Sequence, residues 1–220
     1  MQFEVRRHSL EAPWRYSDLD RRQRECFQEI QKNGSQAYVL ISEVAPVITL
    51  GRRATHTDLT LPLAQLSQRN IEVYETDRGG LATYHGPGQW VVFVVGTLER
   101  LTGDRHGVRA AVEKLLSVGV SVLSEFAVPA EVREGAETGI WVQGKKIGSV
   151  GVRVDAGVLL HGLSLNIFST PESFVGLRPC GLDAPVGFLK DFVTEQTLEA
   201  SDLMEHSKSA IERSIPLFFG

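Results

Sequence analysis

The chain has 220 residues, of which 42% are hydrophobic and 23% charged, a size and balance that favour one globular domain with its own core. Its net charge of -4 at pH 7 argues against a dedicated nucleic-acid-binding protein, because such proteins usually carry a basic surplus. No apolar run approaches the ~20 residues of a membrane span, and the N-terminus lacks the apolar stretch of a secretory signal, so we expect a cytoplasmic protein that binds no membrane.

The first half of the chain begins with a helix and continues mainly as strands. Apolar spacing predicts a helix over 17–34, which Ser17 or Asp18 can cap and Gly34 can end, with Cys26 on its buried face. The next predicted elements are strands at 37–44 and 46–51, a short helix at 61–70, and strands at 71–77 and 90–98.

The second half contains the longest predicted helix, at 104–126, followed by strands at 139–142, 146–154 and 159–167. A C-terminal helix at 197–215, with Ser201 as a candidate cap, completes the chain. The strands bunch in the middle and show no regular βαβ alternation. We therefore predict an α/β (α+β) fold with a mixed, largely antiparallel sheet flanked by helices.

The segment "DRGGLATYHGPGQW", residues 77–90, holds four glycines and one proline between strands. Glycine suits a loop whose backbone must approach a ligand closely, although composition alone favours a hairpin turn with an irregular loop. The spacing matches neither a phosphate-binding loop nor a dinucleotide fingerprint. His85 is either a ligand contact or proton donor, or a hydrogen-bonded structural residue.

Two strands downstream also carry candidate polar groups. In "GKKIGSVGVRV", residues 144–154, Lys146 must find a partner if it points inward, whereas a turn with exposed lysines is the plainer alternative. In "HGLSLNI", residues 161–167, the leucines share one face, and Gly162 and Ser164 leave room on the other. His161 is read as a hydrogen-bonding residue at the strand end.

Cys180 lies between Pro179 and Gly181, on a constrained turn that can present a thiol. By its residue type alone, however, a free cysteine is most often a small buried apolar side chain. The chain has two cysteines, far apart and without metal-ligand spacing, so neither a disulfide framework nor a structural metal site is expected.

Taken together and in this order, "RGGLATYHGPGQ", "KKIGSVGVRV", "HGLSLNI" and "PCG" resemble the lipoyl(octanoyl) transferases, the lipoate–protein ligase B family. The resemblance runs from about Val47 to Gly181. It implies the catalytic-domain fold of biotin- and lipoate-protein ligases, as one domain over 1–220 with its core at about 30–215. Two departures are Ala82, where the family has a β-branched residue, and the segment after Gly181.

The resemblance implies an acyltransferase that moves an octanoyl group from octanoyl-acyl carrier protein to a lysine of lipoyl domains, without a cofactor or metal. The acceptors would be lipoyl domains of 2-oxoacid dehydrogenases and the glycine cleavage H protein. Cys180 would be the acyl-thioester nucleophile, and Lys146 would lower the pKa of its thiol and act as general acid and base. The implied substrate contacts are Arg78, Gly79, Gly80, Leu81, Ala82, Thr83, Tyr84, His85, Ser149, Val150, Gly151, Gly162, Leu163 and Ser164.

Two alternatives stay open at this point. An ATP-dependent lipoate or biotin ligase on the same fold would form an acyl-adenylate and need no cysteine. A binding module could keep the fold without the chemistry. The presence of both Cys180 and Lys146 favours the transferase over either alternative.

Overall fold

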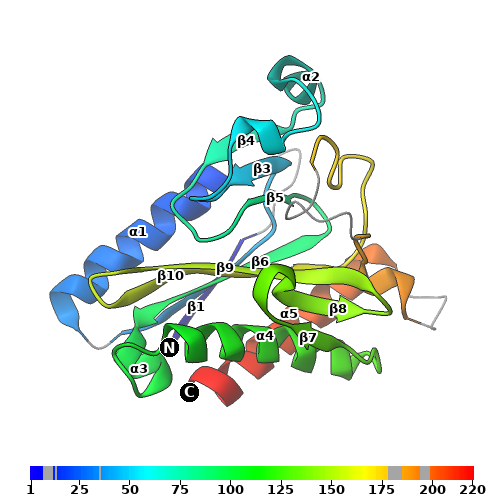
Figure 1. Ribbon diagram of the computed structural model, residues 1–220. Coiled ribbons are helices and arrows are strands. Elements are labelled where there is room, and N and C mark those ends of the chain that lie inside the picture. Colours follow the sequence, from blue (N-terminus) through cyan, green and yellow to red (C-terminus); the bar gives the residue numbers. More distant parts are fainter. Residues whose placement is uncertain (7–11, 13, 35, 178–184, 194–198) are drawn as a thin grey trace.

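A large seven-stranded sheet and a small three-stranded sheet form the framework of the protein (Figure 1). The computed structural model describes residues 1–6, 12, 14–34, 36–177, 185–193 and 199–220. The large sheet contains, from edge to edge, β1 (Gln2–Arg6), β2 (Tyr38–Ser42), β6 (Gln89–Thr97), β10 (Val158–Asn166), β9 (Lys145–Asp155), β8 (Gly139–Val142) and β7 (Glu131–Arg133).

The small sheet consists of β4 (Glu72–Glu75), β3 (Val47–Leu50) and β5 (Ala82–His85), in that order. Among the described strands, β1 pairs with β2 and β3 with β4 in parallel, and the other neighbours pair antiparallel. The predicted mixed, largely antiparallel architecture is therefore confirmed, with a second small sheet that the sequence did not indicate.

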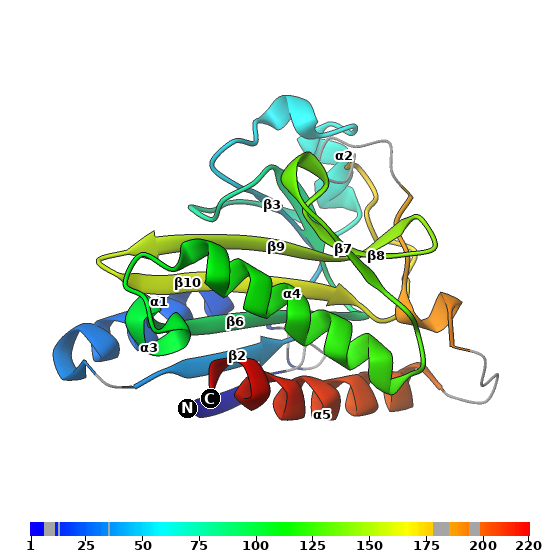
Figure 2. The ribbon, with the colours of Figure 1, turned by 60° about the horizontal axis from the view of Figure 1, so that its bottom comes forward.

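Helices cover both faces of the large sheet. Helix α1 (Tyr16–Asn33) covers one face, and α4 (Val108–Glu125) and α5 (Ala200–Phe219) lie side by side across the other (Figure 2). Two short helices, α2 (Leu63–Gln68) and α3 (Leu98–Thr102), and single turns of 3-10 helix at His56–Asp58, Gly135–Glu137 and Leu189–Asp191 complete the described elements. None of the described helices combines the length and apolarity needed to cross a membrane.

Period-two alternation divides the side chains of the central strands between two cores. In β6, Val92 belongs to the core under α4 and α5, whereas Val91 and Phe93 belong to the core under α1. In β10, Leu163 and Leu165 pack under α4 and α5, as predicted. The opposite face of β10 thereby receives small residues, and this asymmetry makes space for the site described below.

The predicted N-terminal caps of both helices are wrong. Helix α1 begins at Tyr16, so Asp18 lies within its first turn and accepts a hydrogen bond from the Arg15 backbone N–H at 3.2 Å. At its other end Gly34 adopts φ 72° and donates to the Ile30 carbonyl, as predicted. Helix α5 begins at Ala200, directly after Glu199, which places Ser201 inside the helix.

Candidate active site

A cavity of about 270 Å³ lies where the glycine-rich segment meets the large sheet. The segment after β4, the start of α1, strands β5, β6, β9 and β10, and the turn before β8 all contribute to its walls. It is lined by Tyr16, Arg53, Arg78, Gly79, Gly80, Leu81, Ala82, Thr83, His85, Val91, Phe93, Val112, Gly135, Ala136, Thr138, Lys146, Ser149, Val150, Gly151, Val152, Gly162, Leu163 and Ser164.

Most of the residues singled out from the sequence therefore gather around one space. Tyr84 is the exception among the described ones, because it packs in the small-sheet core against Phe174. Cys180 lies outside the described residues, as does the atypical segment up to residue 184. Gly148, on the neighbouring strand β9, faces the core, since a Cβ there would lie 3.0 Å from Cδ1 of Ile140.

Lys146 enters the cavity from β9, next to its hairpin with β8. The side chain is only 6% exposed, and Nζ donates to the Thr138 carbonyl at 2.9 Å and lies 5.7 Å from the centre of the Trp141 ring. A carbonyl oxygen and an aromatic face are both favourable contacts for a cation. Its neighbour Lys145 points elsewhere, with Nζ 5.7 Å from the centre of the Phe192 ring.

Gly139 makes this position of the lysine possible. A Cβ at Gly139 would lie 2.5 Å from Cε of Lys146 and 2.7 Å from the carbonyl oxygen of Gly148. Because real Cβ atoms do not approach other atoms so closely, a side chain at residue 139 would displace Lys146 or the strand beside it. Gly139 is thus required for the site, although none of the sequence motifs pointed to it.

The backbone of Lys146 is paired with the chain that resumes after the undescribed residues 178–184. Its N–H donates to the Pro185 carbonyl at 2.9 Å, and its carbonyl accepts from the Gly187 N–H at 2.9 Å. Gly187 makes a second hydrogen bond, in which its carbonyl accepts from the Asn166 amide at 3.1 Å. The residues that directly follow the cysteine segment are therefore fixed beside Lys146.

Backbone hydrogen bonds clamp the glycine-rich segment on two sides. Gly79 donates to the Val152 carbonyl at 2.9 Å, along the part of β9 that lies beyond its pairing with β8. On the other side, the carbonyls of Arg78 and Gly80 accept from the backbone N–H groups of Arg52 and Arg53, at 3.0 and 3.2 Å. The segment consequently forms a fixed wall of the cavity.

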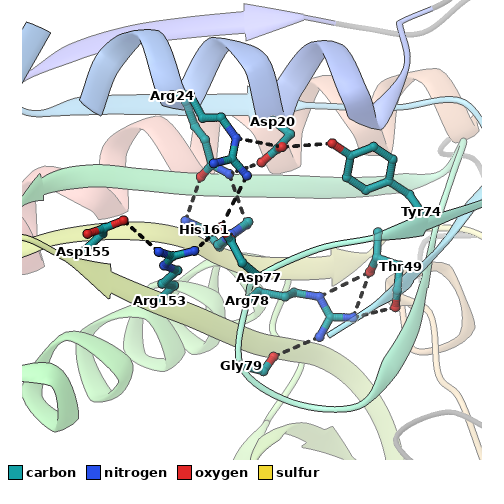
Figure 3. Close-up of polar contacts among 11 residues, drawn as sticks. Asp20, Arg24, Thr49, Tyr74, Asp77, Arg78, Gly79, Arg153, Asp155 and His161 are labelled. Atoms are coloured by element: carbon teal, nitrogen blue, oxygen red, sulfur yellow. Dashed lines mark hydrogen bonds and ion pairs between the residues drawn. The ribbon is translucent and has the colours of Figure 1, made fainter. Parts of the chain in front are cut away.

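Arg78 brings a buried positive charge to this wall. Arg78 is 7% exposed, and its Nη2 donates to the carbonyl and the hydroxyl oxygen of Thr49, both at 2.8 Å, while Nη1 donates to the Gly79 carbonyl at 3.0 Å (Figure 3). These bonds join the small sheet to the glycine-rich segment. They also hold the guanidinium beside the cavity, where it favours an anionic group.

Asp77, directly before Arg78, is anchored to the opposite side of the segment. Its carboxylate accepts from Nε2 of His161 at 2.8 Å and pairs with Arg153 and, at 3.3 Å, with Arg24 (Figure 3). The hydrogen bond from His161 is the main reason that the pKa of Asp77 lies well below its usual range, with the two arginines adding to it and burial opposing it.

His161 occupies an unusual place in a central strand. It adopts φ 63°, a conformation that non-glycine residues rarely take, and its backbone N–H donates to Oε1 of Gln23 on α1 at 2.9 Å instead of to β6. The amide nitrogen of Gln23 lies 3.3 Å from Nδ1, so Nδ1 accepts and Nε2 carries the proton given to Asp77. His161 is therefore a buried structural link, not the strand-end residue expected.

His85 lies at the inner end of the cavity. Nδ1 is 2.6 Å from Oε1 of Gln89, whose amide nitrogen donates to Asn166 at 2.8 Å, so His85 donates through Nδ1. The ring also stacks on Tyr16, with centroids 5.4 Å apart. Burial, aided by the charge of Arg78, lowers the pKa of His85 to about 3, which keeps the imidazole neutral at physiological pH.

The site thus combines a buried lysine, a buried arginine and a neutral histidine around an apolar space. In the described ranges, no group of three or more His, Cys, Asp or Glu side chains is arranged to hold a metal ion. Cys26, the described cysteine, is buried in α1, and burial raises its pKa to about 12, so it is not a nucleophile. The set is suited to binding an apolar chain next to a protonated amine.

Comparison with known proteins gives one family. The model of the lipoyl protein ligase A/B catalytic domain matches residues 20–212. An octanoyltransferase of Magnetococcus marinus is 44% identical over 168 residues, which cover 76% of this chain and 74% of the relative. An octanoyltransferase of Legionella pneumophila (strain Corby) is 36% identical over 159 residues, covering 72% and 75%.

Solved structures show the same fold. A putative lipoate protein ligase from T. acidophilum superimposes with a TM-score of 0.72 at 14% identity, covering 99% of this chain and 85% of that one. A lipoate-protein ligase A bound with ATP gives a TM-score of 0.69 at 16% identity, covering 97% and 86%. At these identities the likeness establishes the architecture of the chain and nothing about its substrates.

Proposed function

Because the chain belongs to the family of the lipoyl protein ligase A/B catalytic domain, we propose that it transfers an octanoyl group from octanoyl-acyl carrier protein to a lysine of lipoyl domains. The family relationship confirms the resemblance inferred from the motifs. The curated relatives are named octanoyltransferases, which agrees with the predicted acyltransferase class. The carrier, the acceptor lysine and a thioester on Cys180 are the parts that we add.

One observation carries this proposal. Lys146 lines the cavity, and its backbone is hydrogen-bonded to Pro185, five residues after Cys180. Five residues span at most about 18 Å, so the length of the chain limits how far Cys180 can lie from the backbone of Lys146. A thiol that reaches the amine of Lys146 beside this cavity would complete the components of thioester exchange.

In the first step the thiolate of Cys180 attacks the carbonyl carbon of the octanoyl thioester on the carrier. The ammonium of Lys146 favours the thiolate, because a nearby positive charge lowers the pKa of a thiol. As the new carbon–sulfur bond forms, the bond to the carrier's sulfur breaks, and Lys146 donates a proton to the departing thiolate. One thioester replaces another, so this step needs no external energy source.

In the second step the amine of the acceptor lysine attacks the thioester on Cys180. Lys146, neutral after the first step, accepts the proton that the amine loses on bond formation. Cys180 then leaves as a thiolate beside the re-formed ammonium. An amide is more stable than a thioester, so the transfer runs downhill without ATP.

The cavity would supply the binding energy for the acyl chain. Its walls include Val91 and Phe93, and burial of each CH₂ group contributes ~0.8 kcal/mol. For an eight-carbon acyl group this amounts to several kcal/mol before the ordering of the chain is counted. Lys146 also lines the cavity, and the thioester would lie beside it.

The decisive experiment is intact-mass spectrometry after mixing the protein with octanoyl carrier protein. We expect an octanoyl adduct that hydroxylamine removes and that is absent from Cys180→Ser. Cys26 gives no competing signal, because it is buried and its thiol has a raised pKa. An unmodified wild-type protein under conditions that support turnover would exclude the covalent route.

The same assay separates the ATP-dependent ligase alternative. A ligase would modify the acceptor domain with free octanoate and ATP, and would ignore the octanoyl carrier protein. We expect the reverse: transfer from the carrier without nucleotide, and none from octanoate with ATP.

A further inference from the structure

We propose that Val91 and Phe93 of β6, closed over by Tyr16, form the end wall of the acyl cavity and set the length of the chain it accepts. The inference deepens the proposed function, because it takes the cavity as the acyl site. It assigns substrate selectivity to residues that none of the sequence motifs contains. Strand register, burial and aromatic contacts support this assignment.

Strand register arranges the cavity floor as two rows of side chains across β6, β10 and β9. The first row is Val91, Ser164 and Ser149, and the second is Phe93, Gly162 and Gly151. Residues paired in this way point to the same face of the sheet. The positions on β10 and β9 are small in both rows, and those on β6 are large.

This contrast in side-chain size makes the two ends of the cavity different. A chain entering beside Lys146 on β9 meets little but backbone while it crosses β10. It then meets the bulky side chains of Val91 and Phe93, which are 1% and 3% exposed. The rows continue onto β2 at Ser42 and Leu40, but neither is among the described residues that line the cavity. The space therefore stops at β6.

Aromatic packing makes this end rigid. The ring of Tyr16 meets that of Phe93 edge to face, with centroids 6.1 Å apart, and stacks on His85 at 5.4 Å. Phe93 in turn meets the ring of His161 edge to face at 5.2 Å. Because these rings pack against one another and are buried, they cannot move aside for a longer acyl chain.

The available span fits a medium-length acyl chain. Two strand spacings separate β9 from β6, or roughly 10 Å. Eight carbons joined by bonds of roughly 1.5 Å in a zigzag extend about 9 Å. Each further methylene would have to displace a buried side chain, and one methylene in an apolar pocket typically changes selectivity by ~10-fold or more.

The test compares Val91→Ala with Val92→Ala. Val92 is the neighbouring valine of the same strand and is equally buried, but it faces α4 and α5 and does not line the cavity. Each variant receives an equal mixture of octanoyl and decanoyl carrier protein together with a lipoyl domain, and mass spectrometry measures the product ratio. Phe93→Leu serves as a second enlargement of the same wall.

We expect Val91→Ala and Phe93→Leu to raise the decanoyl-to-octanoyl product ratio by ~10-fold, and Val92→Ala to keep the wild-type ratio. An unchanged ratio in both wall variants, or an equal shift in Val92→Ala, overturns the assignment.

A binding measurement keeps this test separate from the reaction itself. Calorimetric titration of each variant with octanoate and with decanoate should show the same change in preference without any turnover. If the wild-type protein transfers nothing but these affinities shift as described, the chain-length assignment stands and the proposed transfer fails. If transfer proceeds and neither ratio moves, the assignment alone fails.

Discussion

Replacing Asp77 by asparagine probes how the glycine-rich segment is held beside the cavity. Asp77→Asn keeps the size of the side chain and an oxygen that can accept from His161, but removes the charge that pairs with Arg153 and Arg24. Asp155→Asn is the matched control. Asp155 pairs with the same Arg153 at 2.7 Å, yet it lies at the end of β9 and is more exposed.

The expected loss of unfolding free energy follows from the hydrogen bonds and ion pairs that each substitution removes. A hydrogen bond to a charged partner contributes about 1.5–3 kcal/mol and a neutral one about 1 kcal/mol. Arg24 is half exposed, so its pairing with Asp77 adds little. We therefore expect Asp77→Asn to lose about 1–2 kcal/mol of unfolding free energy, and Asp155→Asn to lose less than about 0.5 kcal/mol.

The difference in unfolding free energy between wild type and Asp77→Asn should depend on pH. The pKa of Asp77 is lowered in the folded protein, chiefly by the hydrogen bond from His161. Its contribution to stability is therefore complete above the ordinary carboxyl pKa of about 3.9 and is lost as the pH falls below it. Asparagine does not titrate. The gap between wild type and Asp77→Asn should be full at pH 6 and shrink below about pH 4.

Urea unfolding followed by tryptophan fluorescence measures this gap at each pH, and titration with octanoate measures the effect on the cavity. If loosening of the segment removes about 1 kcal/mol from the bound state, octanoate affinity falls about fivefold in Asp77→Asn. Equal behaviour of Asp77→Asn and Asp155→Asn, or a gap that persists unchanged at pH 3.5, would refute this account of the segment.

Three further predictions concern Lys146, Gly139 and His85. Lys146→Ala should slow alkylation of Cys180 at pH 7 by about 10-fold, because we expect the thiol pKa to rise by about one unit. Lys145→Ala should leave the alkylation rate unchanged. Equal rates in the two variants would mean that the wrong lysine was chosen. Gly139→Ala should reproduce the alkylation defect with Lys146 still present, since a Cβ there would lie 2.5 Å from its Cε, and normal alkylation would contradict that crowding. Because the pKa of His85 is lowered to about 3 in the folded protein, the unfolded chain binds a proton at this residue that the folded chain does not bind. The free energy of unfolding should therefore fall by up to about 1.4 kcal/mol per pH unit as the pH drops below about 6.5. The slope in urea midpoints should flatten in His85→Gln, and an unchanged slope would assign the acid sensitivity to other groups.

The fold was predictable where periodicity was strong and long. Helices α1 and α4 and strands β9 and β10 were found because each carries an apolar pattern over at least nine residues. Strand β5 was missed, because its four residues follow a glycine-rich stretch and pair with a separate small sheet. Edge strands β1 and β7 were missed since they are short and largely exposed, and so lack a clear alternation.

The site was predictable as a set of segments but not as a geometry. The motifs located the walls around Arg78, Lys146 and Gly162, yet the resemblance implied contacts at every residue from Arg78 to His85, Tyr84 included. Once the alternation of β5 is known, Thr83 and His85 face the cavity and Tyr84 faces the small-sheet core.

Some features of the site have no local signal. Tyr16 reaches the cavity from the start of α1, far from every motif in the chain. The left-handed backbone of His161 depends on Gln23, which is 138 residues away. Tertiary contacts of this kind cannot be read from a segment's own composition.

Strand β10 has a consequence for how this protein can be altered. Leu163 and Leu165 fill the core on one face while Gly162 and Ser164 leave the cavity open on the other. Adding or deleting one residue between His161 and Asn166 would exchange these faces, pushing leucine into the acyl space and leaving a void beneath α4 and α5. Natural variation and engineered libraries can therefore change residue types along this strand, but its length is fixed.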